Sequence, residues 1–271
     1  SGGLVGGIIY GGSVRNSHAT GDVSGRDAIG GLIGEIFTTR GSVRNSYATG
    51  NVSDSWKFSM VGGLVGGTGG SVANSYATGN VDGNGLAGGL IGVTVGPVRN
   101  SMATGNVIGS YNVGGLIGDN RASVPVRNST ATGSVSGTAR VGGLIGYNRV
   151  NASVRDSSAT GSVSGSKNVG GIVGQNIGSV TNMTATVNVS GSSNVGGLIG
   201  SNGGSVRVVS VTGRVNGSTN VGGLVGDNDV LETYRWDWDS FHRTITVYHH
   251  GSVTNPYATT NVTGSTAVGG L

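Results

Sequence analysis

Hydrophobic positions along this chain recur in two short phrases separated by polar turn residues. The first phrase is Val-Gly-Gly-Leu-Ile-Gly, which stands in full at residues 113–118. The second is Ser-Val-Arg-Asn-Ser-Tyr-Ala-Thr-Gly-Asn-Val-Ser, at residues 42–53. Both phrases are rich in β-branched residues and bounded by Gly, Asn and Ser, and no stretch carries apolar residues at the 3.6-residue spacing of a helix. The pattern therefore predicts short strands joined by turns.

The two phrases alternate along the whole chain, which makes the sequence an internal repeat. Most steps between Gly pairs are 26 or 28 residues, one is 32 and the last is 47. The Gly pairs begin at Gly2, Gly30, Gly62, Gly88, Gly114, Gly142, Gly170, Gly196, Gly222 and Gly269. Nine repeats result, and each is predicted to hold three short strands.

A repeat of this length with three short strands is predicted to form one coil of a β-solenoid. The expected fold is therefore all-β: a single-stranded solenoid of about nine coils, right-handed by analogy with most large solenoids, spanning roughly 45 Å at about 4.8 Å per coil. We expect residues 1–226 to form the first eight coils and residues 252–271 the last. Residues 227–251 lengthen the final step and are expected to form an inserted hairpin.

Comparison of the copies predicts which side chains point inward. The Val of Ser-Val, the Ala of Ala-Thr and the Val of Asn-Val are nearly invariant among the nine copies, so we expect them to fill the core. The Asn of the second phrase, as in Asn45, is expected at an inward or corner position where amides of successive coils form a ladder. The following Ser is expected at a bend near the core.

The Gly pair is expected at a sharp bend of every coil. A Cβ atom repeated there at each coil would clash with its equivalents above and below, which explains why glycine recurs.

Composition narrows the class of protein. Gly fills 57 of 271 positions, charged residues make up 10% and aromatic residues 5%, and the net charge is +4. Cysteine is absent, so disulfides and thiolate metal sites are excluded. No apolar run approaches the roughly 18 residues that span a membrane. The chain begins and ends within a phrase, so we expect it to be a segment of a longer array or a processed product.

The combination of "VGGLIG" with "GSVRNSYATGNVSG" resembles the GLUG repeat. That repeat occurs in bacterial surface proteins, in adhesins and in the non-catalytic parts of some immunoglobulin-A-cleaving metallopeptidases. The resemblance covers nearly the whole chain outside the insertion, and it implies an extracellular, cell-surface or fibre-forming context. It implies no catalytic residue, because the His-Glu-x-x-His zinc motif of those peptidases is absent here.

The insertion is the first candidate binding site. Tyr234, Trp236 and Trp238 alternate along one predicted strand, and its turn is expected near residues 239–240. Together with Phe241 and Tyr248 they would form a platform for a sugar ring or for an apolar patch of a partner. The alternative is a hairpin that folds over the solenoid or contacts a neighbouring subunit.

A metal site is not expected in the insertion, and no cofactor is expected in the chain. His249 and His250 are adjacent, and adjacent residues of a strand point to opposite faces.

Arginines at one repeat position form the second candidate site. They are Arg15, Arg44, Arg99, Arg127, Arg155 and Arg207. Stacked coils would align them as a broken basic stripe that attracts an anionic partner such as an acidic glycan. The alternative is a solvated face whose like charges oppose lateral stacking. Specific nucleic-acid binding is not expected, because no aromatic residues interleave with the stripe.

Enzymatic activity is not expected, because the sequence holds no nucleophile elbow, no phosphate loop and no repeated pair of carboxylates. A polysaccharide-acting β-helix enzyme is kept as an alternative. A row of threonines, one per repeat, adds ice binding as a further alternative, although the neighbouring outward position is mixed.

The sequence therefore favours a structural protein. We expect a stalk or fibre segment of an extracellular bacterial surface protein, which associates with itself or continues into further repeats. The alternative is an adhesin that binds glycan or protein on a host surface through the inserted hairpin.

Overall fold

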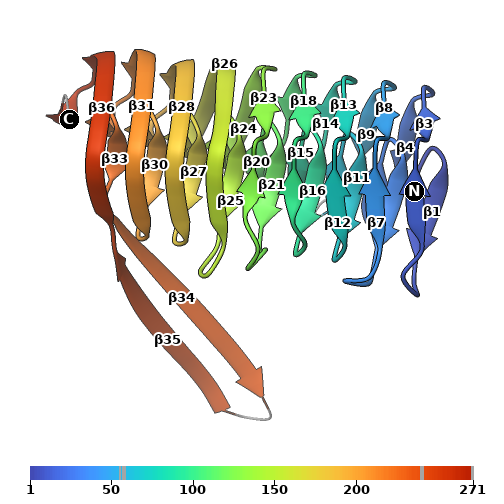
Figure 1. The fold of residues 1–271 in the computed structure, drawn as a ribbon. Coiled ribbons are helices and arrows are strands. Elements are labelled where there is room, and N and C mark those ends of the chain that lie inside the picture. The colour runs from blue at the N-terminus through green and yellow to red at the C-terminus, as the bar shows by residue number, and fades with distance from the viewer. Residues whose placement is uncertain (55, 57–58, 239–240, 270–271) are drawn as a thin grey trace.

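The structure of the chain, a computed structural model, describes residues 1–54, 56, 59–238 and 241–269; of residues 233–238 and 241–246 it describes the backbone. Every helix or strand within these residues is a β-strand. The strands stack as parallel rungs of an elongated solenoid, with the N-terminal coil at one end and the C-terminal coil at the other (Figure 1). The predicted all-β solenoid is confirmed.

One sheet collects the Leu-Ile-Gly strands of successive coils. Its nine strands are β1 (Val5–Ile8), β6 (Ile33–Ile36), β11 (Val65–Thr68), β16 (Ile91–Thr94), β21 (Ile117–Asn120), β25 (Ile145–Asn148), β27 (Val173–Asn176), β30 (Ile199–Asn202) and β33 (Val225–Asp227). Nine strands enclose eight intervals, so the solenoid makes about eight full turns, slightly fewer than the nine coils that the sequence predicted.

The second sheet contains 26 strands and covers the rest of each coil. The Ser-Val strands are β2 (Ser13–Arg15), β7 (Ser42–Arg44), β12 (Ser71–Ala73), β17 (Val98–Arg99) and β22 (Val126–Arg127). The Ala-Thr strands are β3 (His18–Ala19), β8 (Tyr47–Ala48), β13 (Tyr76–Ala77), β18 (Met102–Ala103) and β23 (Thr130–Ala131). The Asn-Val strands are β4 (Val23–Gly25), β9 (Val52–Asp54), β14 (Val81–Asp82) and β19 (Val107–Ile108). The strands that lead into the Gly pair are β5 (Ala28–Gly30), β10 (Met60–Gly62), β15 (Leu86–Gly88) and β20 (Tyr111–Gly114).

In the later coils these short strands merge. The merged strands are β24 (Val135–Gly142), β26 (Ser153–Gly170), β28 (Ser179–Ser190), β31 (Ser205–Asn216) and β36 (Ser252–Thr263), accompanied by β29 (Ser193–Gly196), β32 (Thr219–Gly222) and β37 (Thr266–Gly269). The predicted three strands per coil are found in later coils such as β30 to β32, whereas an early coil such as β6 to β10 has five. Residues in the left-handed region occur in both kinds of coil, at Asn45 and Asn74 between short strands and at Asn182 and Val208 within merged ones.

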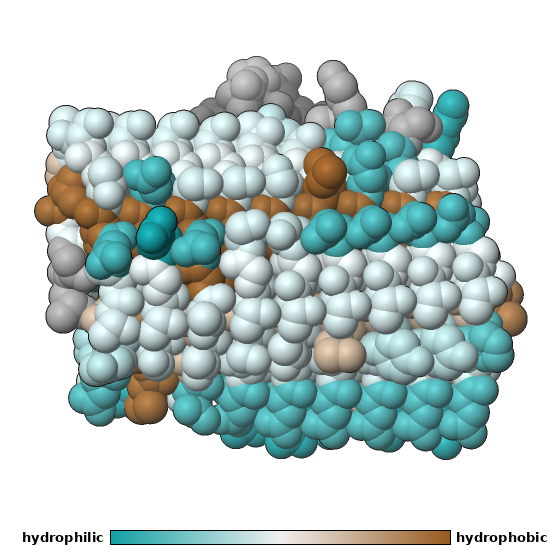
Figure 2. Space-filling model, turned by 90° about the horizontal axis from the view of Figure 1, so that it is seen from above, coloured by the Kyte–Doolittle hydropathy of each residue, from teal (hydrophilic) through white to brown (hydrophobic). Residues whose placement is uncertain are grey.

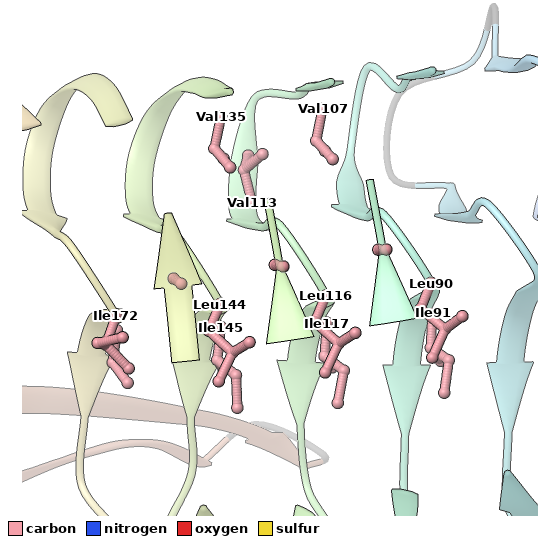
Figure 3. Packing of buried hydrophobic residues seen from close by; sticks show 14 of the residues in the cluster. Leu90, Ile91, Val107, Val113, Leu116, Ile117, Val135, Leu144, Ile145 and Ile172 are labelled. Atoms are coloured by element: carbon pink, nitrogen blue, oxygen red, sulfur yellow. The ribbon is translucent and has the colours of Figure 1, made fainter. Parts of the chain in front are cut away.

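The predicted internal columns are confirmed. Val43, Val72 and Val98 pair coil to coil, and each is 0% exposed. Figure 3 shows the same arrangement in the centre of the stack, where Leu90, Leu116 and Leu144 follow one another along the stack in equivalent positions. Burial of a side chain of this size contributes about 1.5–3 kcal/mol. Since each column repeats the same volume, every internal coil fits the coils on both sides.

Both residues of the Gly pair must be glycine, because the neighbouring backbone leaves no room for a side chain. A Cβ at Gly88 would collide with the carbonyl oxygen of Ile91 in its own coil, and a Cβ at Gly89 would collide with the carbonyl oxygen of Gly115 in the next. The sequence predicted a clash with the equivalent Cβ atoms, whereas the structure shows that backbone carbonyls occupy the space. A side chain is therefore excluded at Gly88 by its own coil and at Gly89 by the next coil.

The asparagines of the second phrase form a corner, as predicted, but they lie on the outside. Asn45 and Asn74 are exposed and have φ of 49° and 50°. The Asn74 Nδ2 donates to the Asn45 Oδ1 at 3.2 Å, and the Asn100 Nδ2 donates to the Asn74 Oδ1 at 3.1 Å. Figure 2 shows the consequence of this stacking, since side chains of like polarity form rows along the long axis.

The serine that follows each of these asparagines lies near the core, as predicted. Ser46, Ser75 and Ser101 are 1–3% exposed. Each Ser Oγ accepts a hydrogen bond from the backbone N–H of the equivalent serine one coil earlier, for example the Ser75 Oγ from Ser46 N–H at 3.2 Å.

Candidate functional site

The six arginines of the predicted stripe occupy one column. Arg15 pairs with Arg44, and Arg99 pairs with Arg127, which pairs with Arg155. Ala73 interrupts the column between Arg44 and Arg99, and Thr181 interrupts it before Arg207. All six side chains are exposed or half-exposed. The structure therefore brings these residues into line, as the repeat predicted.

The predicted insertion forms an antiparallel hairpin that leaves the C-terminal end of the stack (Figure 1). Its strands are β34 (Asp229–Trp238) and β35 (Phe241–His250). The turn expected at residues 239–240 lies outside the described residues, and so do the side chains of Tyr234, Trp236, Trp238 and Phe241. Tyr248 is described: it lies opposite Leu231, and the two are 69% and 58% exposed.

The base of the hairpin is anchored on the nine-stranded sheet. Val230 is 4% exposed and packs with Tyr147 of β25 and with Ile177. The Tyr147 hydroxyl donates a hydrogen bond to Glu232. His250 and Asp229 lie 2.8 Å apart, and His249 lies 3.7 Å from Glu232. The hairpin is thus held through its first few residues.

Two arginines support the anchoring tyrosine. The guanidinium carbons of Arg140 and Arg149 lie 4.9 and 4.5 Å from the centre of the Tyr147 ring. Burial raises the pKa of Tyr147 well above its usual value of 10.0, and the hydrogen bond to Glu232 and its charge raise it further. The phenol therefore keeps its proton and remains a donor.

Arg149 also satisfies a buried carboxylate. Asp119 is 0% exposed, and Arg121 and Arg149 contact it at 2.9 and 2.8 Å. Burial alone would lower the pKa of Arg149, but the hydrogen bonds and the charge of Asp119 outweigh that effect and raise it. The guanidinium stays charged, so Asp119 keeps its counter-ion.

A cleft of about 310 Å³ opens beside the hairpin base. The cations Arg140 and Lys167 line it, and so do the carboxylates of Asp227 and Asp229. Amides from the two sheets line it as well: Asn168, Asn194 and Gln175. We call this cavity the hairpin-base cleft. It places both signs of charge within one small space.

A second cavity, of about 300 Å³, adjoins the hairpin-base cleft. Leu86 and Asn112 line it, and the two cavities share Tyr111 and Arg140. The pair forms a hollow that follows the stack over several coils.

A buried row of asparagines runs beside the cleft on the nine-stranded sheet. Asn120, Asn148 and Asn176 are each 0% exposed, and each donates through Nδ2 to the Oδ1 of the next member, at 2.7–2.8 Å. Neither this row nor the cleft was predicted from the sequence. An Asn two residues after each Leu-Ile-Gly phrase, from Asn120 onward, was the available signal for the row.

No metal centre emerges from the described residues, since no three of their His, Asp and Glu side chains gather where an ion could be held. Nor is any described helix long and apolar enough to cross a membrane.

Comparison with known proteins identifies the repeat. The family model of the GLUG motif matches residues 1–24, 25–53, 59–82, 137–164 and 165–190. Searches of curated proteins and of solved structures gave no match to this chain. The coils between and after the matched ranges stack in register with the matched ones; Val107, for example, pairs with Val81 and Val135.

Proposed function

The chain carries five GLUG motifs and has a β-solenoid fold, and from this premise we propose that it is a rigid stalk or fibre segment of an extracellular bacterial surface protein. Its task is to hold another part of the assembly at a distance, by end-to-end stacking of coils. No chemical step is needed for this role, and none is proposed.

The register between coils carries this proposal. In β28 and β31, eleven residue pairs match without a slip, from Ser179 with Ser205 to Ser190 with Asn216. Each internal coil is bonded to one neighbour on either side, so bending the rod would stretch hydrogen bonds of the whole coil. At about 4.8 Å per interval, eight intervals give a rod of roughly 40 Å.

The end coils supply the surfaces for stacking. Among the described strands, β36 pairs with β31 and with no strand beyond it. Its Val253, Ala258 and Val262 continue the core columns and are partly exposed. An edge of this kind pairs readily with a like edge. We propose that further coils, of the same array or of a second molecule, cover it.

Small-angle X-ray scattering with negative-stain electron microscopy tests the proposal. We expect an elongated particle that lengthens with concentration in steps of roughly 40 Å. Ala258→Lys places a charge on the open end of a core column, so this variant should stay folded and monomeric. Compact particles without elongation, or equal association by the variant, would contradict the proposal.

The projecting hairpin supports adhesion as a second candidate function. It is the described element that departs from the coil surface, and Leu231 and Tyr248 expose apolar area on it. Exposed apolar area of this kind marks contact surfaces.

A glycan array tests adhesion through the hairpin. The double variant Trp236→Ala/Trp238→Ala should lose at least tenfold in binding, because stacking aromatics contribute strongly to such contacts. Equal binding by the intact chain and the variant would assign the hairpin a structural role.

A further inference from the structure

The hairpin-base cleft is lined by side chains of opposite charge. Arg140 and Lys167 come from the coils, whereas Asp227 and Asp229 lie where the chain leaves the last Leu-Ile-Gly strand for the hairpin. A ligand that fits both signs of charge carries an anionic group together with groups that donate hydrogen bonds to carboxylates. The four side chains of this arrangement are independent of the rod-forming columns.

The guanidinium of Arg140 is held in place before any ligand arrives. The Arg140 Nε donates to the Gln175 Oε1 at 2.7 Å, and Nη1 donates to the Asn112 Oδ1 at 3.3 Å. The Tyr147 ring lies against the same guanidinium. Among the described residues, Nη2 of Arg140 and the ammonium of Lys167 have no hydrogen-bond partner. These donors are therefore available to an anion.

A buried amide adds a donor to the cleft. Gln175 is 3% exposed, and its Oε1 accepts from Arg140 and from the Asn168 Nδ2, the latter at 3.1 Å. Gln175 also lines the cleft, and its Nε2 makes no hydrogen bond to any other described residue. This amide is therefore a donor available to a ligand oxygen.

The depth of the cleft comes from one small residue. Tyr111, Ala139 and Lys167 occupy the same column in three successive coils. At about 4.8 Å per coil, the two large side chains start roughly 10 Å apart, and Ala139 leaves the space between them open. That space matches the length of one pyranose ring with its substituents.

Tyr111 gives the hollow an apolar surface. Its side chain is 52% exposed and lines both cavities. An exposed aromatic ring beside amides and carboxylates suits a ligand that is apolar on one face and rich in hydroxyls at its edge. Sugars have this character.

We infer that the hairpin-base cleft binds an acidic sugar residue of a glycan. The sugar carboxylate lies against Arg140, Lys167 and the Gln175 amide, its hydroxyls donate to Asp227 and Asp229, and one ring face lies on Tyr111. A phosphate dianion would bring its two negative charges close to the carboxylates of Asp227 and Asp229, which line the same cleft. The adjoining cavity extends the site for a second sugar ring.

Isothermal titration calorimetry with D-glucuronic acid and D-glucose tests this inference on the full chain. The two sugars differ only at C6, where glucuronic acid carries the carboxylate. We expect glucuronic acid to bind with a dissociation constant near 1 mM, the range of a single small ligand, and glucose to bind at least tenfold more weakly.

Three variants locate the binding. Lys167→Gln should weaken glucuronic acid about tenfold, since one charge-assisted hydrogen bond is lost. Ala139→Leu should fill the cleft and abolish binding without a change in charge. Arg214→Gln removes an exposed cation outside the cleft and should bind as the intact chain does. Circular dichroism confirms that each variant is folded.

Each contrary result overturns a defined part of the inference. Equal affinity for the two sugars would show that the cleft does not select acidic sugars. Unchanged binding by Ala139→Leu would place the ligand elsewhere. If neither sugar bound at a concentration 50-fold above the expected dissociation constant, the cleft would not be a sugar-binding site. The rod proposal would stand, because its test does not involve sugar binding.

Discussion

At the scale of single residues, the corner asparagines explain how the backbone turns at each coil. The left-handed region costs an ordinary residue about 1–2 kcal/mol, whereas Asn enters it readily. The Asn side chain also extends the amide ladder, as Asn74 does between its two neighbours. Val208 is the exception: it has φ of 49°, is 52% exposed and stands between the asparagine positions 182 and 255.

Val208→Asn is therefore expected to stabilise the protein. Relief of the left-handed strain of a β-branched residue and a new ladder hydrogen bond should together add about 1–2 kcal/mol to the free energy of unfolding. Chemical denaturation monitored by circular dichroism measures the change.

The reverse exchange is the matched control. Asn74→Val introduces the same strain and breaks two ladder bonds, so it should destabilise by at least as much. If both variants were neutral, the corner conformation would not be the reason for asparagine in this column.

At the scale of elements, the hairpin depends on a small anchor. Tyr147 joins it to the solenoid through Glu232, and the ring is held between Arg140 and Arg149. Val230 supplies the buried apolar contact. Most of the hairpin lies beyond these residues, so its position depends on the anchor rather than on the core.

Tyr147→Phe should loosen the hairpin and leave the coils intact. A hydrogen bond to a charged group contributes about 1.5–3 kcal/mol, so hydrogen exchange in β34 and β35 should accelerate at least tenfold. Exchange in β28 and β31 should not change. Equal protection of the hairpin in both proteins would show that the hydroxyl does not hold it.

The same anchor gives a pH dependence. The pKa of Tyr147 is raised in the folded chain above its usual 10.0, so the folded state retains this proton more strongly than the unfolded state. The contribution is fully present below pH 10 and decreases as the pH rises above that value. Protection of the hairpin amides from hydrogen exchange should therefore decrease in alkaline solution. In Tyr147→Phe the contribution of this hydroxyl is absent, so the same decrease should not occur.

At the scale of the whole molecule, the solenoid is a one-dimensional assembly. Each coil pairs only with its two neighbours along the stack, so stability accumulates coil by coil and folding spreads from any nucleus. The repeated columns prevent a slip in register, because a shift of one residue would turn the core valines to solvent. The same continuity makes the rod rigid and leaves its end coils able to pair.

Much of this fold could be predicted from the repeat. The inward valines, the glycine bends and the amide ladder followed from positions that do not vary among copies. The number of strands per coil could not be predicted, because the ends of a strand depend on backbone angles that the amino-acid sequence does not reveal. The buried asparagine row was missed because Asn usually marks a turn. Its members tolerate burial only because Asn120, Asn148 and Asn176 bond to one another.

The sequence by itself determined the stacking of like residues over like, because a fixed period of short strands can bury its valines only by adding one coil to the next. The tertiary structure alone decided where the hairpin starts from the stack and which side chains it meets there. Arg140 and Asp227 belong to coils that are far apart in the sequence. They line one cleft because each coil stacks on the one before it at a constant rise. The neighbouring coils carry Asn168 and Ser201 at the same two repeat positions, so the repeat does not predict either charge, and only the assembled coils bring the two side chains together.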